Sequence, residues 1–129
     1  MSTLLGLTAA AALASPTPQT HPDHPYPGIG RVVELDFGED SYELRFEEDG
    51  RTMTYVCTRG PEQGETETVQ YTAIATAPDH YLLYWIEPVH RATVAQVQDW
   101  FADRVYTNIT SEGLEFTNLS GTLRDKGPL

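Results

Sequence analysis

Apolar and polar side chains alternate along most of the chain after residue 30. In Arg31–Phe37 the apolar residues are separated by acidic ones, and Ser41–Glu47 repeats the pattern. An alternation with period two is typical of a strand with one buried face. Asp49-Gly50, after the second run, supplies the positive φ that a tight hairpin needs. The pattern therefore predicts an antiparallel meander at the start of this region.

Similar runs continue to the C-terminus. The predicted strands are Arg31–Phe37, Ser41–Glu47, Thr52–Thr58, Thr66–Thr76, Tyr81–Glu87, Thr93–Asp99, Arg104–Ile109 and Leu114–Leu119, with Gly121–Arg124 as a short ninth strand in the longer alternative. Ala92–Ala102 also fits one helical turn pattern, but we interpret it as strand. Eight or nine strands in succession must stack as a sandwich or close on themselves, and closure removes the exposed edges. We therefore predict an all-β, antiparallel up-and-down barrel, wide enough for one small ligand.

The first 29 residues differ from the rest. Met1–Pro27 contains one formally charged side chain, Asp23, and Leu4–Ala14 is apolar and ends in a small-x-small sequence. This segment is either a secretory leader or a short helix that packs on the domain. Ser15–Pro27 holds five of the nine prolines and is expected to form an extended strap. We thus divide the chain into an N-terminal segment, 1–29, and one β-barrel domain, 30–129.

Length and charge limit the partners. A chain of 129 residues fits one domain, and its formal net charge of −11 repels phosphate backbones and anionic lipid headgroups. Nucleic acid and membrane partners are therefore not expected.

The single Cys57 allows no internal disulfide and no paired-cysteine metal site, and we expect no metal and no cofactor. A cytoplasmic location is favoured over secretion, because Met1–Thr3 lacks the basic residue of a leader.

The run Tyr81–Glu87 carries the most informative chemistry. Tyr81, Leu83, Trp85 and Glu87 share one face of the predicted strand. If that face points inward, desolvation raises the pKa of Glu87 toward neutrality, which suits a general acid or base. The alternative is a strand-end glutamate in solvent.

The opposite face of the same strand is also apolar. Leu82, Tyr84 and Ile86 would point outward, and contiguous exposed apolar area usually marks an interface. We expect either a homodimer through this strand or docking of Leu4–Leu13 on it.

Short motifs add a resemblance to known proteins. Trp85-Ile86-Glu87-Pro88, together with Tyr42-Glu43-Leu44 and Tyr55, resembles the phenolic acid decarboxylase family and its MoaF-like relatives. Val105–Thr110 and Leu119–Leu123 are more similar to the MoaF-like branch. The resemblance covers Val32 to Leu123 and implies a calycin-like, lipocalin-like barrel with a central ligand cavity.

The resemblance also implies roles for single residues. Glu87 falls on the catalytic glutamate of the family, and Tyr55 and Tyr42 fall on tyrosines of the same cavity. The first strand, however, lacks the family's tyrosine pair, and residues 60–65 carry Glu62 and Glu65 in place of its arginine. Carboxylates there would repel a substrate carboxylate, so an uncharged or cationic ligand is expected and not a phenolic acid.

Two functions remain open from the sequence. The first, favoured by the resemblance, is a cofactor-free acid–base enzyme of the lyase, isomerase or cyclase type that acts on a small aromatic or polyene-like compound. The second is a non-catalytic, lipocalin-like protein that binds a small hydrophobic ligand. Candidate catalytic residues are Glu87, Tyr55 and Tyr42, and candidate ligand-binding residues are Trp85, Tyr81, Leu83, Leu44, Phe46 and Met53.

Three further residues are interpreted conservatively. His80 and His90 are expected in loops, where a histidine is usually exposed to solvent. Cys57 shares a face with Met53 and Tyr55 and is expected to be a small buried side chain.

Overall fold

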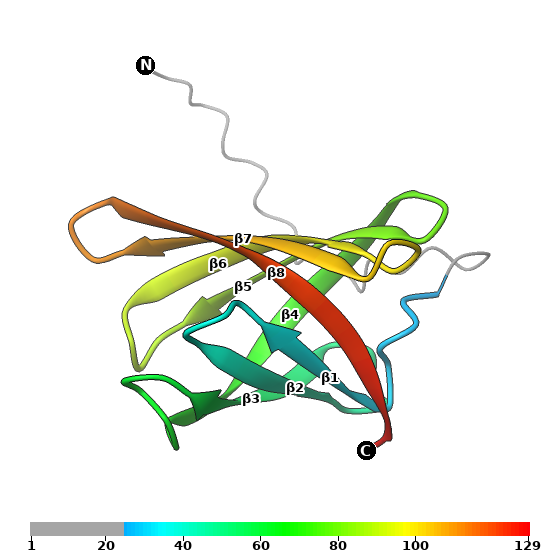
Figure 1. The fold of residues 1–129 in the computed structure, drawn as a ribbon, viewed down its shortest axis with the longest axis horizontal. Coiled ribbons are helices and arrows are strands. Elements are labelled where there is room, and N and C mark those ends of the chain that lie inside the picture. The colour runs from blue at the N-terminus through cyan, green and yellow to red at the C-terminus, as the bar shows by residue number, and fades with distance from the viewer. Residues whose placement is uncertain (1–24) are drawn as a thin grey trace, which may run out of the picture.

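The computed structural model describes residues 25–129, and this part of the chain is an eight-stranded closed barrel (Figure 1). The strands are β1 (Arg31–Asp36), β2 (Ser41–Phe46), β3 (Thr52–Arg59), β4 (Thr66–Ala77), β5 (His80–Glu87), β6 (Ala92–Asp99), β7 (Arg104–Ser111) and β8 (Glu115–Pro128). Each strand pairs antiparallel with the next, and β8 returns to pair with β1. The predicted all-β, antiparallel up-and-down barrel is confirmed.

The C-terminal strand shows how the barrel closes. Leu114–Leu119 and Gly121–Arg124, predicted as two strands in the nine-strand alternative, lie in the single long strand β8. Gly121 lies where β8 meets the end of β1, and a Cβ there would overlap the carbonyl oxygen of Asp36. A glycine at this position lets the two backbones approach closely. The eight-strand alternative is therefore correct.

The alternation along β5 confirms the predicted inward and outward faces. Tyr81, Leu83 and Trp85 are buried, whereas Tyr84 is 42% exposed and Ile86 is 63% exposed. The run Ala92–Asp99 is likewise a strand, with every second side chain buried. The alternation of apolar and polar residues along the chain therefore identified the inward and outward faces of the barrel wall.

One end of the barrel is filled by an aromatic side chain from the N-terminal side. Tyr26 is 2% exposed, and its ring meets four other aromatic rings edge-on. These rings belong to Phe46, Tyr71, Tyr81 and Trp100. Tyr26 belongs to the predicted strap, Ser15–Pro27, and its side chain lies in the core of the barrel.

A buried polar chain runs from this closed end toward the middle of the barrel. Tyr26 and Trp100 both donate hydrogen bonds to Oε1 of Gln98, at 2.7 and 2.9 Å. The Gln98 amide donates to Gln96, which donates to Thr107. Because each buried amide finds a partner, these inward glutamines are accommodated without an unpaired group.

The other N-terminal predictions lie outside the described residues. These are the apolar segment Leu4–Ala14 and the strap up to residue 24. Within residues 25–129, no helix has the length and apolar character needed to cross a membrane.

Candidate functional site

The end of the barrel opposite Tyr26 holds a cavity of about 410 Å³. It lies among the ends of the strands next to the β1–β2, β3–β4 and β5–β6 connections. Its lining includes Leu35, Phe37, Asp40, Tyr42, Leu44, Tyr55, Pro61, Glu62, Trp85, Glu87, His90, Ala92, Val94, Gln96, Thr107, Ile109, Ser111, Thr117 and Leu119. Such a volume is in the range of small-molecule sites, so the cavity is the candidate site of function.

The structure brings five of the residues predicted from the sequence to this cavity. Glu87, Tyr55, Tyr42, Trp85 and Leu44 all line it. The other four do not line it, because they are buried in the core: Tyr81, Leu83, Phe46 and Met53. Tyr81 and Phe46 contact the ring of Tyr26 at the closed end.

Glu87 lies at the end of β5 with its carboxyl against the cavity wall. Trp85 donates its indole N–H to Oε2 of Glu87 at 2.9 Å, and the Tyr55 hydroxyl lies 3.2 Å from Oε1. Burial raises the pKa of Glu87, and the hydrogen bonds from Trp85 and Tyr55 only partly offset that effect. The carboxyl therefore holds its proton at a higher pH than an exposed glutamate does.

Tyr55 on β3 connects Glu87 with a second group of polar residues. Its hydroxyl lies 2.8 Å from Nδ1 of His90 and 3.1 Å from Oε1 of Glu67. Burial and the neighbouring carboxylates raise the pKa of Tyr55, so the phenol stays protonated. A phenol donates one proton and accepts others, and Tyr55 can therefore pass a proton between the two sides. Tyr42 stacks edge-on against the Tyr55 ring, with centroids 6.3 Å apart.

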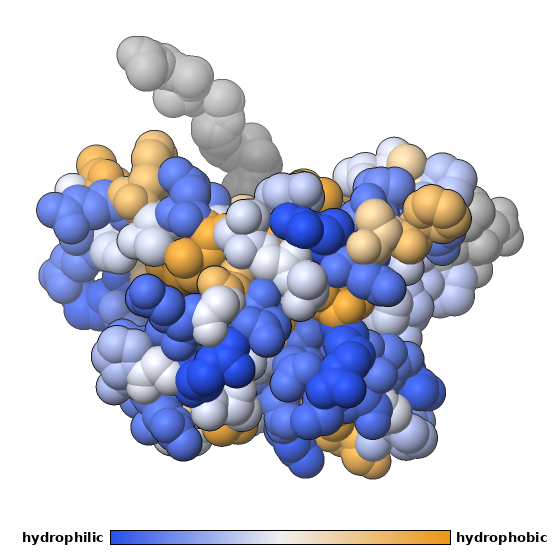
Figure 2. All heavy atoms as spheres, viewed as in Figure 1, coloured by the Kyte–Doolittle hydropathy of each residue, from blue (hydrophilic) through white to orange (hydrophobic). Residues whose placement is uncertain are grey.

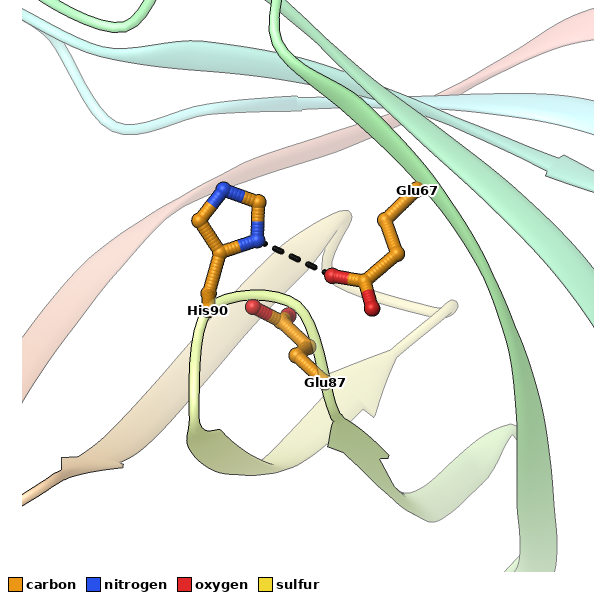
Figure 3. A group of neighbouring side chains, drawn as sticks. All are labelled: Glu67, Glu87 and His90. Atoms are coloured by element: carbon orange, nitrogen blue, oxygen red, sulfur yellow. Dashed lines mark hydrogen bonds and ion pairs between the residues drawn. The ribbon is translucent and has the colours of Figure 1, made fainter.

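The second group is an ion-paired histidine on the β5–β6 loop. Nδ1 of His90 lies 2.9 Å from Oε1 of Glu67, and Nε2 lies 2.7 Å from Oε1 of Glu65. The dashed line in Figure 3 marks the contact between His90 and Glu67. The hydrogen bonds to Glu67 and Glu65 raise the pKa of His90. His90 is exposed, as expected of a loop histidine, and its ring also lines the cavity.

The two carboxyls next to Tyr55 differ in acidity. Desolvation acts to raise the pKa of Glu67, but hydrogen bonds from the Val89 N–H and from His90 outweigh it, and the pKa is lowered. The pKa of Glu87 is raised instead. Two titratable groups whose environments separate their pKa values can divide the roles of acid and base. The arrangement can therefore hold a proton on Glu87 while Glu67 remains ionised.

The same side chains also offer donor atoms for a metal. One atom each from Glu67, Glu87 and His90 lies within 4.8 Å of the others. Both ring nitrogens of His90 and both oxygens of Glu87 already have hydrogen-bond partners. Protons shared in these hydrogen bonds explain why the three side chains lie so close together. The absence of a metal, expected from the sequence, stays a prediction.

The cavity wall is acidic. Asp40 from the β1–β2 connection and Glu62 from the β3–β4 connection line it together with Glu87. Neither arginine nor lysine is among the residues that line it, and His90 is the one lining side chain that can carry positive charge. Carboxyl groups at the wall disfavour an anionic ligand, and the expected uncharged or cationic ligand stays a prediction.

Sequence reasoning did not identify Glu67. It is 9% exposed and shares the inward face of β4 with Val69 and Tyr71. A glutamate on an otherwise apolar face was the signal that could have found it.

The other two residues considered from the sequence do not line the cavity. His80 lies at the closed end, where its ring contacts Pro78 and Asp99. Cys57 is 1% exposed, as expected.

Comparisons with known proteins agree with this architecture. One solved structure, from Burkholderia vietnamiensis, belongs to a protein provisionally named a beta-lactamase. It is 36% identical to this chain, with a TM-score of 0.73, and the alignment covers 78% of this chain and 96% of the other. No curated protein sequence matches the chain significantly. The model of the MoaF-like family matches residues 29–124, nearly the whole barrel, and the chain therefore belongs to the MoaF-like family.

Proposed function

We propose that this protein is a cofactor-free acid–base enzyme of the lyase, isomerase or cyclase type, with Glu87 as the proton-transferring group. The observation that carries the proposal is the pairing of a desolvated carboxyl at the cavity wall with Tyr55. Proton transfer is fastest when the pKa of the acting group lies near the working pH, and burial moves the pKa of Glu87 in that direction.

The surrounding residues supply a path for the proton. Tyr55 contacts Glu87 on one side and both Glu67 and His90 on the other. A proton received by Glu87 can move through the Tyr55 hydroxyl to Nδ1 of a neutral His90, whose pKa is raised, while ionised Glu67 stabilises the imidazolium that forms. Glu67 does not line the cavity, and its proposed role is to position Tyr55 and His90.

The lining supports an uncharged or cationic substrate with an apolar part. Asp40, Glu62 and Glu87 place carboxyl groups around the cavity, whereas Leu35, Leu44 and Trp85 give it an apolar wall. A small aromatic or polyene-like compound fits these surroundings.

The beta-lactamase name of the similar protein from Burkholderia vietnamiensis is not supported by the serine and lysine positions of this chain. Serine beta-lactamases use a serine with a neighbouring lysine. Ser111 lines the cavity, but Lys126, the one lysine of the sequence, binds Glu43 on the barrel exterior. The described residues therefore favour proton transfer over acyl transfer to serine.

The proposal can be tested with a generic substrate for base catalysis, 5-nitrobenzisoxazole, which is small, neutral and aromatic. A base removes its ring C–H proton while the N–O bond breaks, and a coloured phenolate forms. We expect the rate to rise with pH through the raised pKa of Glu87 and then to level off. Glu87→Gln should lower the rate by about 10²-fold or more, the usual contribution of a positioned base.

The matched control is Glu47→Gln, which alters an exposed glutamate on the β2–β3 turn. Its rate should equal that of the unaltered protein. Equal rates for Glu87→Gln and Glu47→Gln would refute the role of Glu87. Quenching of tryptophan fluorescence by the compound, without turnover, would favour the non-catalytic binding protein.

A further inference from the structure

One side of the barrel carries charge only at its rim, where Arg51 borders a hollow and the Arg104 guanidinium lies over the Tyr106 ring. The outward residues of β4 to β8 in this region, called here the uncharged face, are Thr68, Gln70, Thr72, Ile74, Leu82, Tyr84, Ile86, Thr93, Ala95, Val97, Tyr106, Asn108, Thr110, Phe116, Asn118 and Ser120. These five strands are consecutive neighbours in the barrel, so the residues form one continuous surface.

The large side chains of this face are well exposed. Ile86 is 63% exposed, Tyr106 52%, Tyr84 42% and Val97 42%. Phe116 at the edge is 72% exposed. Exposed apolar side chains on neighbouring strands, set among uncharged polar ones, indicate a contact surface.

Charge is concentrated elsewhere on the molecule. The outward positions of β1 and β2 include Glu34, Asp36, Glu43 and Arg45, and Figure 2 shows hydrophilic residues gathered over β1–β3. The chain as a whole carries a net charge of −11. Two copies repel each other through their other surfaces, so they can approach closely where this face meets itself.

The shape of the face also suits a second copy. Ala95 at its centre is exposed and small, and hollows lie on both sides of it. Tyr106 and Val97 border one hollow, and Tyr84 and Ile86 border the other. A two-fold axis would place the tyrosines of each copy over the hollows of its partner, which is the pattern of an isologous interface.

The size of the face fits a weak dimer. Five strands at a spacing of about 4.8 Å, each contributing about seven residues at about 3.3 Å, span roughly 24 by 23 Å. A stable dimer buries about 800 Å² on each partner. The outline of roughly 550 Å² is smaller than this and curves with the barrel wall, so the uncharged face has the size of a weak, transient interface.

We propose that the uncharged face is a homodimer interface, in which two barrels pack side against side around Ala95. The cavity opens at the end of the barrel, among the β1–β2, β3–β4 and β5–β6 connections, and the face lies on the barrel wall. Dimerisation leaves the cavity open, so this proposal does not depend on the proposed function.

Light scattering coupled to size-exclusion chromatography tests the proposal with the full chain. We expect a dimer of the unaltered protein at about 100 µM. Tyr84→Glu and Val97→Glu should each weaken the dimer by about 30-fold or more, as at interface hot spots. Thr58→Glu, an outward position of β3 away from the face, is the control and should leave the dimer intact.

Salt provides a second, independent measurement. The dissociation constant of the dimer should fall when sodium chloride screens the repulsion between the two acidic chains. A monomeric full chain, including one whose own N-terminal segment covers the face, would overturn the proposal. A dimer that survives Tyr84→Glu and Val97→Glu, or that Thr58→Glu dissociates equally, would also overturn it.

Discussion

Two glutamates share one tyrosine beside the cavity. Glu87 receives hydrogen bonds from Trp85 and Tyr55, yet burial keeps its pKa raised. Glu67 is held by His90 and by a backbone N–H, and its pKa is lowered. The two neighbouring carboxyls therefore release their protons at different pH values, an arrangement in which one carboxyl can act as acid and the other as base.

The raised pKa of Glu87 also affects stability. A carboxyl whose pKa is raised by folding binds its proton more tightly in the folded chain than in the unfolded chain. Its contribution to stability is therefore fully present below the ordinary pKa of 4.5 and is lost as pH rises through the folded value. Glu67 acts in the opposite sense, because its lowered pKa stabilises the folded chain above 4.5 and this contribution is lost in acid.

At this scale the sequence predicted part of the site. The alternation of inward and outward side chains along β5 placed Trp85 and Glu87 on the inward face, and the family resemblance added Tyr55. The sequence could not show how far along the barrel each inward residue lies. Leu83 and Met53 share inward faces with the cavity residues but lie in the packed core. His90 was named only as a loop residue, because its contacts depend on Glu65 and Glu67 from other parts of the chain.

At the scale of elements, three consecutive segments converge on the site. β3 carries Tyr55, β4 carries Glu67, and the end of β5 with its following loop carries Glu87 and His90. Antiparallel pairing brings Tyr55 opposite Glu67 across β3 and β4. Rigid strands therefore hold three of the four side chains, and a short loop holds the fourth.

The strands themselves were predictable, because alternation and turn residues are local signals. The plug was not. Tyr26 follows a proline-rich stretch, and local signals there indicate only an extended chain. Its burial depends on an empty aromatic-lined space at the end of the closed barrel, which no local pattern describes.

Removal of the plug should destabilise the barrel strongly. Tyr26→Ala should lower the free energy of unfolding by roughly 3–5 kcal/mol, because it opens a large cavity in the core. Tyr26→Phe should cost only about 1 kcal/mol, since Trp100 still donates to Gln98 after the tyrosine hydrogen bond is lost. Urea unfolding measures both values.

Phe101→Ala is the control, because Phe101 is 83% exposed on the β6–β7 turn. Its effect should stay within about 0.5 kcal/mol. Equal effects of Tyr26→Ala and Phe101→Ala would contradict the role of Tyr26 as a plug.

At the scale of the whole molecule, charge is distributed unevenly. The cavity wall is acidic, the outward side of β1 and β2 is charged, and the uncharged face lies on β4 to β8. The sequence predicted the sign of the net charge and the closed fold. It did not predict the continuity of the uncharged face, because that surface joins strands whose order in space follows only from closure.

The acidic wall should select ligands by charge. N-phenyl-1-naphthylamine and 1-anilinonaphthalene-8-sulfonate share one aromatic framework, but the second carries a negative charge. We expect the neutral dye to bind at least about tenfold more tightly at low salt, a difference of about 1.4 kcal/mol. Dye fluorescence titration measures both affinities.

Glu62→Gln should narrow this difference, because it removes one negative charge from the cavity wall. Glu47→Gln at the closed end should leave it unchanged. Preference for the sulfonate, or an equal response to the two variants, would show that the cavity does not select by charge.

The central claim is that the cavity holds Glu87 as an acid with a raised pKa. Carbon-13 NMR of protein labelled at the glutamate carboxyl carbons tests this directly, with Glu87→Gln used to assign the signal. We predict that the Glu87 carboxyl titrates above 4.5, and that Tyr55→Phe raises its pKa further by removing a hydrogen bond to the carboxylate. Titration of Glu87 at or below 4.5 would contradict the account.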